Sequence, residues 1–306
     1  MSKAETMRIG NRTVKLSNLD KVFYPATGFT KGDVIDYYDA ISPALLPHLK
    51  SRPATLKRYP DGVEGNFFYE KRCPPHRPEW VKTFEVMRKR DNQKVPYCIL
   101  DNRASLLWAA NLGNLELHLS LARAPDITKP TSLVFDLDPD PAVGIIGCCR
   151  VALWLRDMLD EVGLHSFPKT SGSKGLQMYA PLNTKVSFED TGSFAHALAK
   201  EVEKQHPDQV VSKMAKDLRV GKVLIDWSQN DGHKTTASVY SLRAMKTPSV
   251  STPLEWKEVE SALKKDNAES LFFGPKDVLR RVDRKGDIFE PVRKLRQKLP
   301  RWDAEE

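Results

Sequence analysis

The sequence has no apolar run approaching the roughly 20 residues that a membrane-spanning helix needs, so no membrane partner is expected. The opening residues, MSKAETMRIGNR, contain no apolar stretch after their charges, which predicts that there is no secretory leader. Internal repeats and low-complexity linkers are lacking as well. These absences predict a globular protein of the cytoplasm.

Cysteine is scarce, with Cys73, Cys98, Cys148 and Cys149 as the 4 examples in 306 residues. They form no C-x-x-C pair and no Cys/His group with zinc spacing. Cys148 and Cys149 fall where a helix is expected to begin, which favours a packing role. We therefore predict neither a disulfide nor a zinc site.

Two nucleotide-binding fingerprints, the P-loop and the G-x-G-x-x-G motif, are also missing. The chain instead carries an excess of basic residues, with a formal net charge of +8. Basic chains often bind polyanions, because each phosphate that Lys or Arg neutralises releases counterions. The alternative is a uniformly basic, soluble surface. Basic residues that cluster with aromatic and glycine-containing segments favour nucleic acid.

Periodicity predicts an α/β (α+β) fold with a mixed central sheet flanked by helices, in a single domain over 1–306. Its N-terminal lobe covers about 1–130 and its catalytic lobe about 131–250, followed by a helical, charged C-terminal region over about 251–306. In the first lobe, strands are expected at 13–16, 55–59 and 66–71, a helix after the capping residue Thr30, and an exposed loop over 73–96. In the second, strands at 133–138, 164–170, 176–180 and 223–228 alternate with helices at 149–162 and around 194–202.

The stretch Leu133-Val134-Phe135-Asp136-Leu137-Asp138 alternates with a period of two. The apolar side chains should face the core, which leaves Asp136 and Asp138 together on the opposite face. Adjacent carboxylates repel each other unless a cation lies between them, and hard divalent cations suit that position. A pair of solvated aspartates at a strand end is the more frequent outcome for a D-x-D sequence taken alone.

A third carboxylate changes that balance. Asp226 lies in a second apolar strand, Val223-Leu224-Ile225-Asp226, where an unpaired buried charge would be costly. Three aspartates on neighbouring strands are able to hold two metal ions that act on a hydroxyl and a leaving phosphate. The alternative is an ion pair between Asp226 and Lys222 or Arg219.

Other segments suit nucleotide binding with less specificity. The loop Ser171-Gly172-Ser173-Lys174-Gly175 offers backbone N–H groups and a lysine to a triphosphate, although such loops are as often simple turns. Arg243 ends a strand-like stretch over 237–242 and is able to fork onto phosphate oxygens. His118, between leucines, is more often a structural histidine than a ligand. Because Phe67 and Phe68 are adjacent, one should face the core and the other is free to stack on a base.

Together these segments resemble the polymerase (primase-like) domain of bacterial DNA ligase D, in the archaeo-eukaryotic primase superfamily, from about Val14 to about Arg243. The most specific stretches are DKVFYPATG at 20–28, LVFDLDP at 133–139, TSGSKGL at 170–176 and VLIDWSQN at 223–230, followed by KTT and YSLR. The resemblance implies a two-lobed primase-polymerase fold.

The resemblance also implies a role for each matching residue. The metal ligands would be Asp136, Asp138 and Asp226. The incoming nucleotide would be contacted by Lys57, His118, Ser171, Lys174, Gln229 and Arg243, with Phe67 or Phe68 stacking on its base. Lys21 and Lys31 would hold the 5′-phosphate of a downstream strand, beside the free N–H groups of a helix start. Arg219, in the basic loop over 213–222, would help to organise the DNA end and the active site.

Cofactors and partners follow from the same resemblance. It implies two Mn²⁺ or Mg²⁺ ions, nucleoside triphosphates, DNA ends, gapped duplexes, a Ku partner, a DNA ligase and action at the nucleoid. Gln177 departs from the family, whose members commonly carry His there. The K-x-D-G nucleophile of ligases is absent from the sequence, so the chain is expected to be an isolated domain or a polymerase whose ligase is a separate protein.

We therefore predict a template-directed polymerase that adds nucleotides, with ribonucleotides preferred, at DNA ends and gaps during non-homologous end joining. A primase that starts chains de novo is one alternative, and an unprimed template distinguishes it. A non-catalytic DNA-end-binding module is another, and it would be insensitive to a chelator. A metal-dependent phosphohydrolase, which shortens DNA, is the third.

Overall fold

The computed structural model describes residues 5–88 and 91–300 and divides the chain into two compact units. Unit 1 comprises residues 1–125, 235–251 and 274–286, and unit 2 comprises 126–234, 252–273 and 287–306. The chain therefore returns to unit 1 twice after leaving it. Residues 235–250, which the sequence groups with the catalytic lobe, belong to unit 1. That these units act as a single domain stays a prediction.

Unit 2 is built on a five-stranded sheet in the order β11-β12-β10-β14-β13. Its strands are β10 (Ser132–Pro139), β11 (Phe167–Thr170), β12 (Leu176–Pro181), β13 (Val210–Val211) and β14 (Val223–Asp226). Its helices are α3 (Gly144–Glu161), α4 (Phe188–Gln205), α5 (Trp256–Lys265), α7 (Pro291–Lys294) and the 3₁₀ turns η1 (Lys216–Arg219), η2 (Trp227–Gln229) and η3 (Ala268–Leu271). Only the β13–β14 pair is parallel among these pairings, so the sheet is mixed, as predicted.

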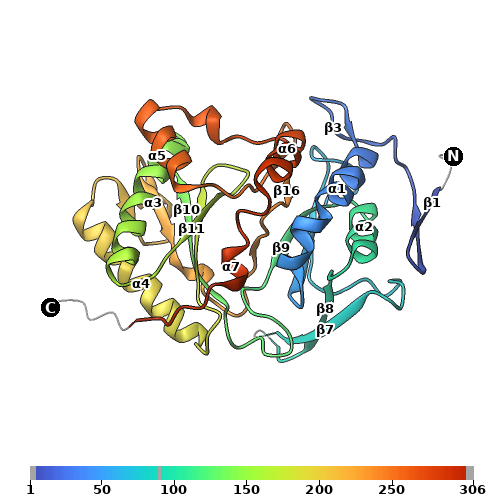
Figure 1. The fold of residues 1–306 in the computed structure, drawn as a ribbon, viewed down its shortest axis with the longest axis horizontal. Helices are drawn as coiled ribbons and strands as arrows, with labels where there is room; N and C mark the ends of the chain where they lie inside the picture. Colours follow the sequence, from blue (N-terminus) through green and yellow to red (C-terminus); the bar gives the residue numbers. More distant parts are fainter. Residues whose placement is uncertain (1–4, 89–90, 301–306) are drawn as a thin grey trace. The chain divides into compact units, whose positions relative to one another are not determined.

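The two faces of this sheet differ in chemistry. Leu133, Phe135 and Leu137 of β10 belong to one hydrophobic core with residues of α3 and α4, and Figure 1 shows both helices beside β10 and β11. The predicted packing role of Cys148 and Cys149 is confirmed, because both are buried in this core. With a period of two, the residues between the core positions lie on the other face of the sheet.

Unit 1 holds a six-stranded sheet with β15, β9, β5, β8 and β7 in order and β6 paired to β5. The strands of unit 1, within this sheet and outside it, are β1 (Glu5–Ile9), β2 (Arg12–Leu16), β3 (Val22–Tyr24), β4 (Phe29–Thr30), β5 (Pro53–Arg58), β6 (Phe68–Glu70), β7 (Lys82–Met87), β8 (Lys94–Ile99), β9 (Asn114–Leu119), β15 (Thr236–Ala237), β16 (Leu242–Arg243) and β17 (Ser249–Val250). Its helices are α1 (Lys31–Leu49), α2 (Arg103–Asn111) and α6 (Pro275–Lys285). Thr30 caps α1, as predicted, and its hydroxyl accepts from Asp33 N.

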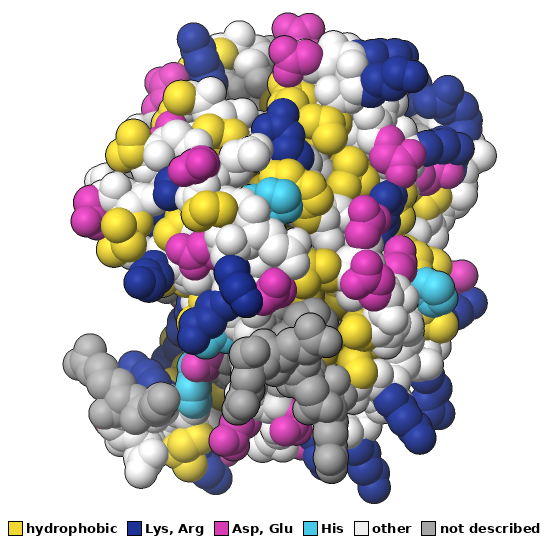
Figure 2. All heavy atoms as spheres, turned by 90° about the vertical axis from the view of Figure 1, so that its left-hand side faces the viewer, with side chains coloured by type: hydrophobic (Ala, Val, Ile, Leu, Met, Phe, Trp, Pro, Cys, Tyr) yellow, Lys and Arg dark blue, Asp and Glu magenta, His cyan; other side chains and the backbone are white. Residues whose placement is uncertain are grey.

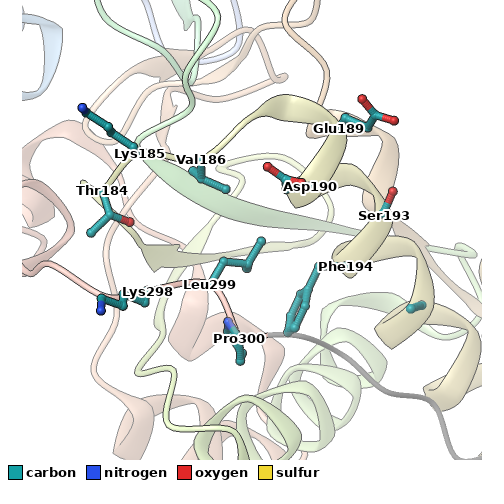
Figure 3. A pocket seen from close by; sticks show the side chains of 11 residues that line it. Thr184, Lys185, Val186, Glu189, Asp190, Ser193, Phe194, Lys298, Leu299 and Pro300 are labelled. Carbon is teal, nitrogen blue, oxygen red and sulfur yellow. The ribbon is translucent and has the colours of Figure 1, made fainter.

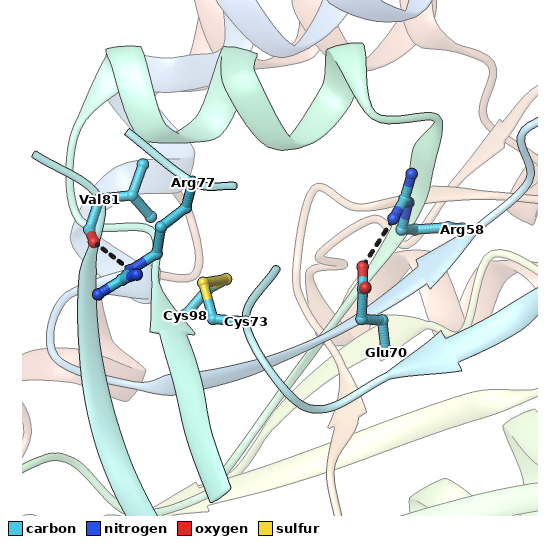
Figure 4. Close-up of a disulfide and its surroundings, with 6 residues drawn as sticks. All are labelled: Arg58, Glu70, Cys73, Arg77, Val81 and Cys98. Atoms are coloured by element: carbon cyan, nitrogen blue, oxygen red, sulfur yellow. Dashed lines mark hydrogen bonds and ion pairs between the residues drawn. A yellow bond between two sulfur atoms is a disulfide. The ribbon is translucent and has the colours of Figure 1, made fainter. Parts of the chain in front are cut away.

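Three expectations about unit 1 are wrong. The segment 73–96 is not simply a loop, because it contains β7 and the start of β8, which pair along their full length. The stretch 237–242 is not one strand, because it runs from the last residue of β15 to the first residue of β16. Cys73 and Cys98 form a disulfide, drawn in Figure 4. The backbone N–H of Cys73 donates to Pro96 O at 2.7 Å, so the chain after β6 lies against β8 and brings the two cysteines together.

No helix in the described part of the chain is long and apolar enough to cross a membrane. The face of the molecule in Figure 2 carries Lys and Arg interspersed with Asp and Glu. On that face, the excess of positive charge is not gathered into one basic area.

Candidate active site

The predicted carboxylates lie on the face of the unit 2 sheet opposite the core that it shares with α3 and α4. Asp136 stands directly opposite Asp226 in the antiparallel pairing of β10 and β14. Asp138 is two residues further along β10 and therefore on the same face. Side chains opposite each other on paired strands have Cβ atoms about 5 Å apart. Register alone thus brings together the three aspartates that the sequence nominates.

Asp226 is held by its own neighbours. Its Oδ1 accepts from Ser228 N at 3.0 Å and from Ser228 Oγ at 2.5 Å, and its Oδ2 accepts from Gln229 Nε2 at 2.7 Å. The predicted alternative, an ion pair with Lys222 or Arg219, is not what these residues form. Lys222 donates to Pro207 O, whereas Arg219 lies 3.6 Å from Asp138 Oδ2. Arg219 therefore lies beside Asp138, and its role at the DNA end stays a prediction.

The donor set suits a hard divalent cation, because all three side chains offer carboxylate oxygens. Asp138 is 53% exposed and so is open to a ligand. Within the described residues, however, no three acidic, histidine or cysteine side chains are gathered closely enough as they stand to hold an ion. Binding would therefore require the carboxylates to turn toward one another, with Asp226 exchanging its present partners.

Gln177, the departure from the family pattern, belongs to the same face. It stands opposite Asp136 on β10 and opposite Lys169 on β11. Lys169 is fully buried and donates from Nζ to Gln177 Oε1 at 2.5 Å. The residues Lys169, Gln177, Asp136 and Asp226 therefore form one row across four adjacent strands.

The glycine-containing loop is organised mainly by its own serine. The Ser171 hydroxyl accepts from Ser173 N and Gly175 N, both at 3.2 Å. The expectation that the loop presents free amides therefore fails for these two groups. A Cβ on Gly175 would lie 1.9 Å from Leu137 O, so only glycine fits this close to β10. Lys174 is exposed at the tip.

A buried carboxylate organises the basic residues of unit 1. Glu116 Oε1 lies 3.2 Å from Lys57 Nζ, and its Oε2 lies 2.9 Å from His118 Nε2 and 3.2 Å from Arg243 Nε. Burial alone would raise the pKa of the Glu116 carboxyl, but the hydrogen bond from His118 and the charges of Arg243 and Lys57 outweigh burial and hold that pKa well below its usual range. Sequence reasoning missed Glu116, although the alternation in Leu115-Glu116-Leu117-His118 places it on the same face as His118.

The aromatic residues before and in β6 are more exposed than predicted. Phe67 and Phe68 are 51% and 43% exposed, so the expectation that one faces the core is wrong. Lys57 Nζ lies 4.6 Å from the Phe67 ring centroid and 5.5 Å from that of Tyr69, which sequence reasoning did not single out. Arg58 lies over Phe68 at 5.1 Å. The two phenylalanines thus have different basic partners.

Lys21 and Lys31 lie near each other but have partners of their own. Lys21 Nζ forms an exposed ion pair with Asp61 at 2.5 Å. Lys31 is buried, and its Nζ donates to Ser17 O at 2.6 Å. The premise that the start of α1 has free amides is wrong, because the N–H groups of residues 31, 32 and 33 donate to Lys21 O, Leu19 O and the Thr30 hydroxyl.

A pocket of about 960 Å³ lies elsewhere in unit 2. It is lined by the segment 184–186, by α4 and by residues 298–300, as Figure 3 shows. None of the predicted site residues is among its lining residues. The pocket therefore is separate from the carboxylate face.

Acidic residues in register on adjacent strands, beside a lysine-bearing turn and an arginine, suit metal-assisted chemistry on phosphates, the class that includes metal-dependent nucleotidyltransferases. Comparison with known proteins gives the family. The chain matches the family described as "LigD, primase-polymerase domain" over residues 30–289. It belongs to that family.

The relatives agree with this assignment. The chain is 40% identical over 288 residues to "Multifunctional non-homologous end joining DNA repair protein LigD" of Mycobacterium tuberculosis, covering 90% of this chain and 36% of the relative. It is 31% identical over 251 residues to "Bifunctional non-homologous end joining protein LigD" of Bacillus subtilis, covering 82% and 40%. The chain thus spans only a little over a third of the length of these relatives.

The fold is also that of a solved structure. The chain superimposes with a TM-score of 0.85 and 39% identity on the "Polymerase Domain from Mycobacterium tuberculosis Ligase D in complex with DNA". The match covers 93% of this chain and 99% of the other. The predicted fold class is therefore confirmed, and the chain corresponds to the whole of that domain.

Proposed function

We propose that the chain is a template-directed polymerase that adds nucleotides, with ribonucleotides preferred, at DNA ends and gaps during non-homologous end joining. The observation that carries the proposal is the register of Asp136 against Asp226, with Asp138 on the same face of the sheet. The names of the relatives and the DNA bound to the solved domain support it. Action at the nucleoid, with Ku and a DNA ligase as partners, belongs to the same proposal.

The carboxylates suit two Mn²⁺ or Mg²⁺ ions. When bound, such ions lower the pKa of an attacking hydroxyl and stabilise charge on the leaving phosphate. We assign Asp136 and Asp226 to the ion at the primer 3′-hydroxyl, and Asp136 and Asp138 to the ion at the triphosphate. Arg219, already near Asp138, orients that carboxylate and the DNA end.

The remaining residues bind the nucleotide. Lys174 and Ser171 of the unit 2 loop contact phosphate oxygens, and Gln229 exchanges its bond with Asp226 for a contact with the nucleotide. In unit 1, Lys57, His118 and Arg243 contact the triphosphate and sugar. The exposed ring of Phe67 or Phe68 stacks on the base. Charge-assisted contacts of this kind offset the charge that develops on the phosphates.

Primer extension on a gapped duplex with a 5′-phosphate, in Mn²⁺, tests this function. The protein should extend the primer with ribonucleotides faster than with deoxyribonucleotides, and a chelator should stop extension. Asp226→Asn should lower the rate about a thousandfold, because metal ions supply several kcal/mol of transition-state stabilisation. Asp208→Asn, at an exposed aspartate of the same unit, is the matched control and should extend normally. Extension at an unchanged rate in Asp226→Asn would remove this residue from the site.

A further inference from the structure

Glu116 is a buried carboxylate of unit 1 that contacts several basic side chains. Its side chain is 3% exposed, and its two oxygens are approached by the Lys57 ammonium, the His118 ring and the Arg243 guanidinium. Ala244 N also donates to Oε1 at 3.1 Å. A carboxylate has about four lone-pair positions, so these contacts nearly saturate it. A buried carboxylate with such contacts holds its partners in one geometry.

The three side chains come from different parts of the chain. Lys57 lies on β5, directly opposite Glu116 in the β5–β9 pairing. His118 lies on β9 itself. Arg243 lies on β16, whose ladder partner is β17 and not a strand of the six-stranded sheet. Glu116 therefore ties the β16–β17 hairpin to the sheet at the position of the arginine.

These partners are not simply buried charges that need neutralising. Lys57, His118 and Arg243 keep 13%, 13% and 16% of their side chains exposed, whereas Glu116 keeps 3%. The carboxylate is thus more deeply buried than the three groups, and each of these keeps part of its side chain accessible to a ligand. Two cations against one anion leave a net charge of about +1, with His118 neutral, and this sign suits a phosphate-bearing ligand.

The contact with Glu116 also fixes the chemistry of His118. An ionised carboxylate only accepts hydrogen bonds, so Nε2 of His118 carries the proton. Burial first of all lowers the pKa of His118, against the opposing effect of Glu116, so the ring is neutral at pH 7. Nδ1 is then an acceptor, and an acceptor binds a donor hydrogen such as that of a hydroxyl rather than a phosphate oxygen.

We propose that Glu116 is a positioning residue for nucleotide binding: it holds Lys57 and Arg243 toward the phosphates and fixes the tautomer of His118 with the proton on Nε2, which leaves Nδ1 as the acceptor for a hydroxyl of the nucleotide. The inference rests on the proposed polymerase function. It adds a residue that need not touch the nucleotide and acts through the three that do.

The test compares Glu116→Gln with the wild-type chain in primer extension with Mn²⁺. Gln keeps the size of the side chain, but it removes the charge and turns N–H donors toward Lys57 and Arg243. The KM for the nucleoside triphosphate should rise tenfold or more, with a smaller change in kcat and no change in affinity for the gapped duplex. Asp39→Asn, which breaks the Asp39–Arg103 ion pair of the same unit, is the matched control and should leave KM unchanged.

A double-mutant cycle separates positioning from general destabilisation. If Glu116 acts through His118, then Glu116→Gln/His118→Gln should raise KM by much less than the product of the two single effects. Independent, multiplicative effects on KM would overturn the part of the proposal that concerns His118. Thermal melting identifies a variant that fails to fold. If Glu116→Gln does not fold, Glu116→Asp takes its place as the test. Because Asp keeps the charge, the expected rise in KM is smaller.

The outcomes distinguish the two levels of proposal. Wild-type protein that neither binds a nucleoside triphosphate nor extends a primer overturns the proposed function, and with it this inference. Active wild-type protein with an unchanged KM in folded Glu116→Gln or Glu116→Asp overturns only the role of Glu116.

Discussion

The carboxylate oxygens of Asp226 are occupied by Ser228 and Gln229, whereas Asp138 is half-exposed beside Arg219. Asp138 and Asp226 therefore differ in what a cation would have to displace. Asp138 is held by a 3.6 Å ion pair with Arg219, and exposed pairs of this kind contribute only about 0–1 kcal/mol. Asp226 would have to give up its hydrogen bonds to Ser228 and Gln229 before it could hold a cation.

Substitution of Lys174 tests directly whether the loop 171–175 binds the triphosphate. The side chain is exposed, so Lys174→Ala should leave the fold intact. A charge-assisted contact is worth about 1.5–3 kcal/mol, so the KM for the nucleotide should rise roughly 10- to 150-fold, with some loss of kcat. Lys185→Ala, at another lysine of unit 2, serves as the control. If nucleotide saturation is the same in both variants, the loop is only a turn.

Residue identity alone predicted part of this site. The period of two in β10 placed Asp136 and Asp138 on one face, because alternate residues of a strand point the same way. That Asp226 stands opposite Asp136 is seen only in the pairing of β10 with β14. Partners distant in sequence were beyond that reasoning. The Cys73–Cys98 disulfide depends on the segment after β6 lying against β8, and the role of Gln177 depends on Lys169, which only the β11–β12 register reveals.

Among the secondary-structure elements, those with strong periodicity were predicted best. Helix α4 and strands β10, β12 and β14 lie where the sequence indicated, with differences of a few residues at their ends. The segment 73–96 misled because its Pro, Arg and Lys content is typical of loops, whereas β7 and β8 are stabilised by pairing with each other. The prediction of free N–H groups at the start of α1 failed for another reason. The sequence does not show which groups accept hydrogen bonds from the first amides of the helix.

The close approach of the glycine loop to β10 predicts a specific stability effect. In Gly175→Ala the new Cβ would meet the Leu137 carbonyl oxygen at 1.9 Å, which requires the loop or the strand to move. The free energy of unfolding should fall by about 2 kcal/mol or more, in the range of overpacked sites. Gly192→Ala in α4, where the nearest atom would be 3.3 Å away, is the control and should be close to neutral. Urea denaturation of both variants measures the difference, and equal midpoints would contradict the prediction.

At the scale of the whole molecule, the net charge of +8 predicts affinity for DNA that falls as salt rises. That attraction does not depend on how the DNA end is built. Selectivity for a particular end needs a local site, and Lys21 with Lys31 in unit 1 is the one that the sequence nominated. Because the amides at the start of α1 are already bonded, only the two side chains remain to recognise a 5′-phosphate.

The two lysines predict both a preference and its pH dependence. A gapped duplex with a 5′-phosphate should bind more tightly than one with a 5′-hydroxyl, and Lys21→Ala/Lys31→Ala should abolish the difference. Asp61→Asn, which releases Lys21 from its ion pair, should increase it. Lys15→Ala, at an exposed lysine of β2, is the control and should leave the difference unchanged.

Burial lowers the pKa of Lys31 to about 8, with smaller effects from the charges of Lys21 and Arg58. Lys31 is therefore charged at pH 7 and largely neutral at pH 9. A phosphate monoester keeps its charge over this range, because its second pKa is about 6. The preference for the 5′-phosphate should accordingly weaken between pH 7 and pH 9. Fluorescence anisotropy at fixed salt measures both duplexes, and a preference that is absent at pH 7, or that does not change up to pH 9, would remove Lys31 from the phosphate site.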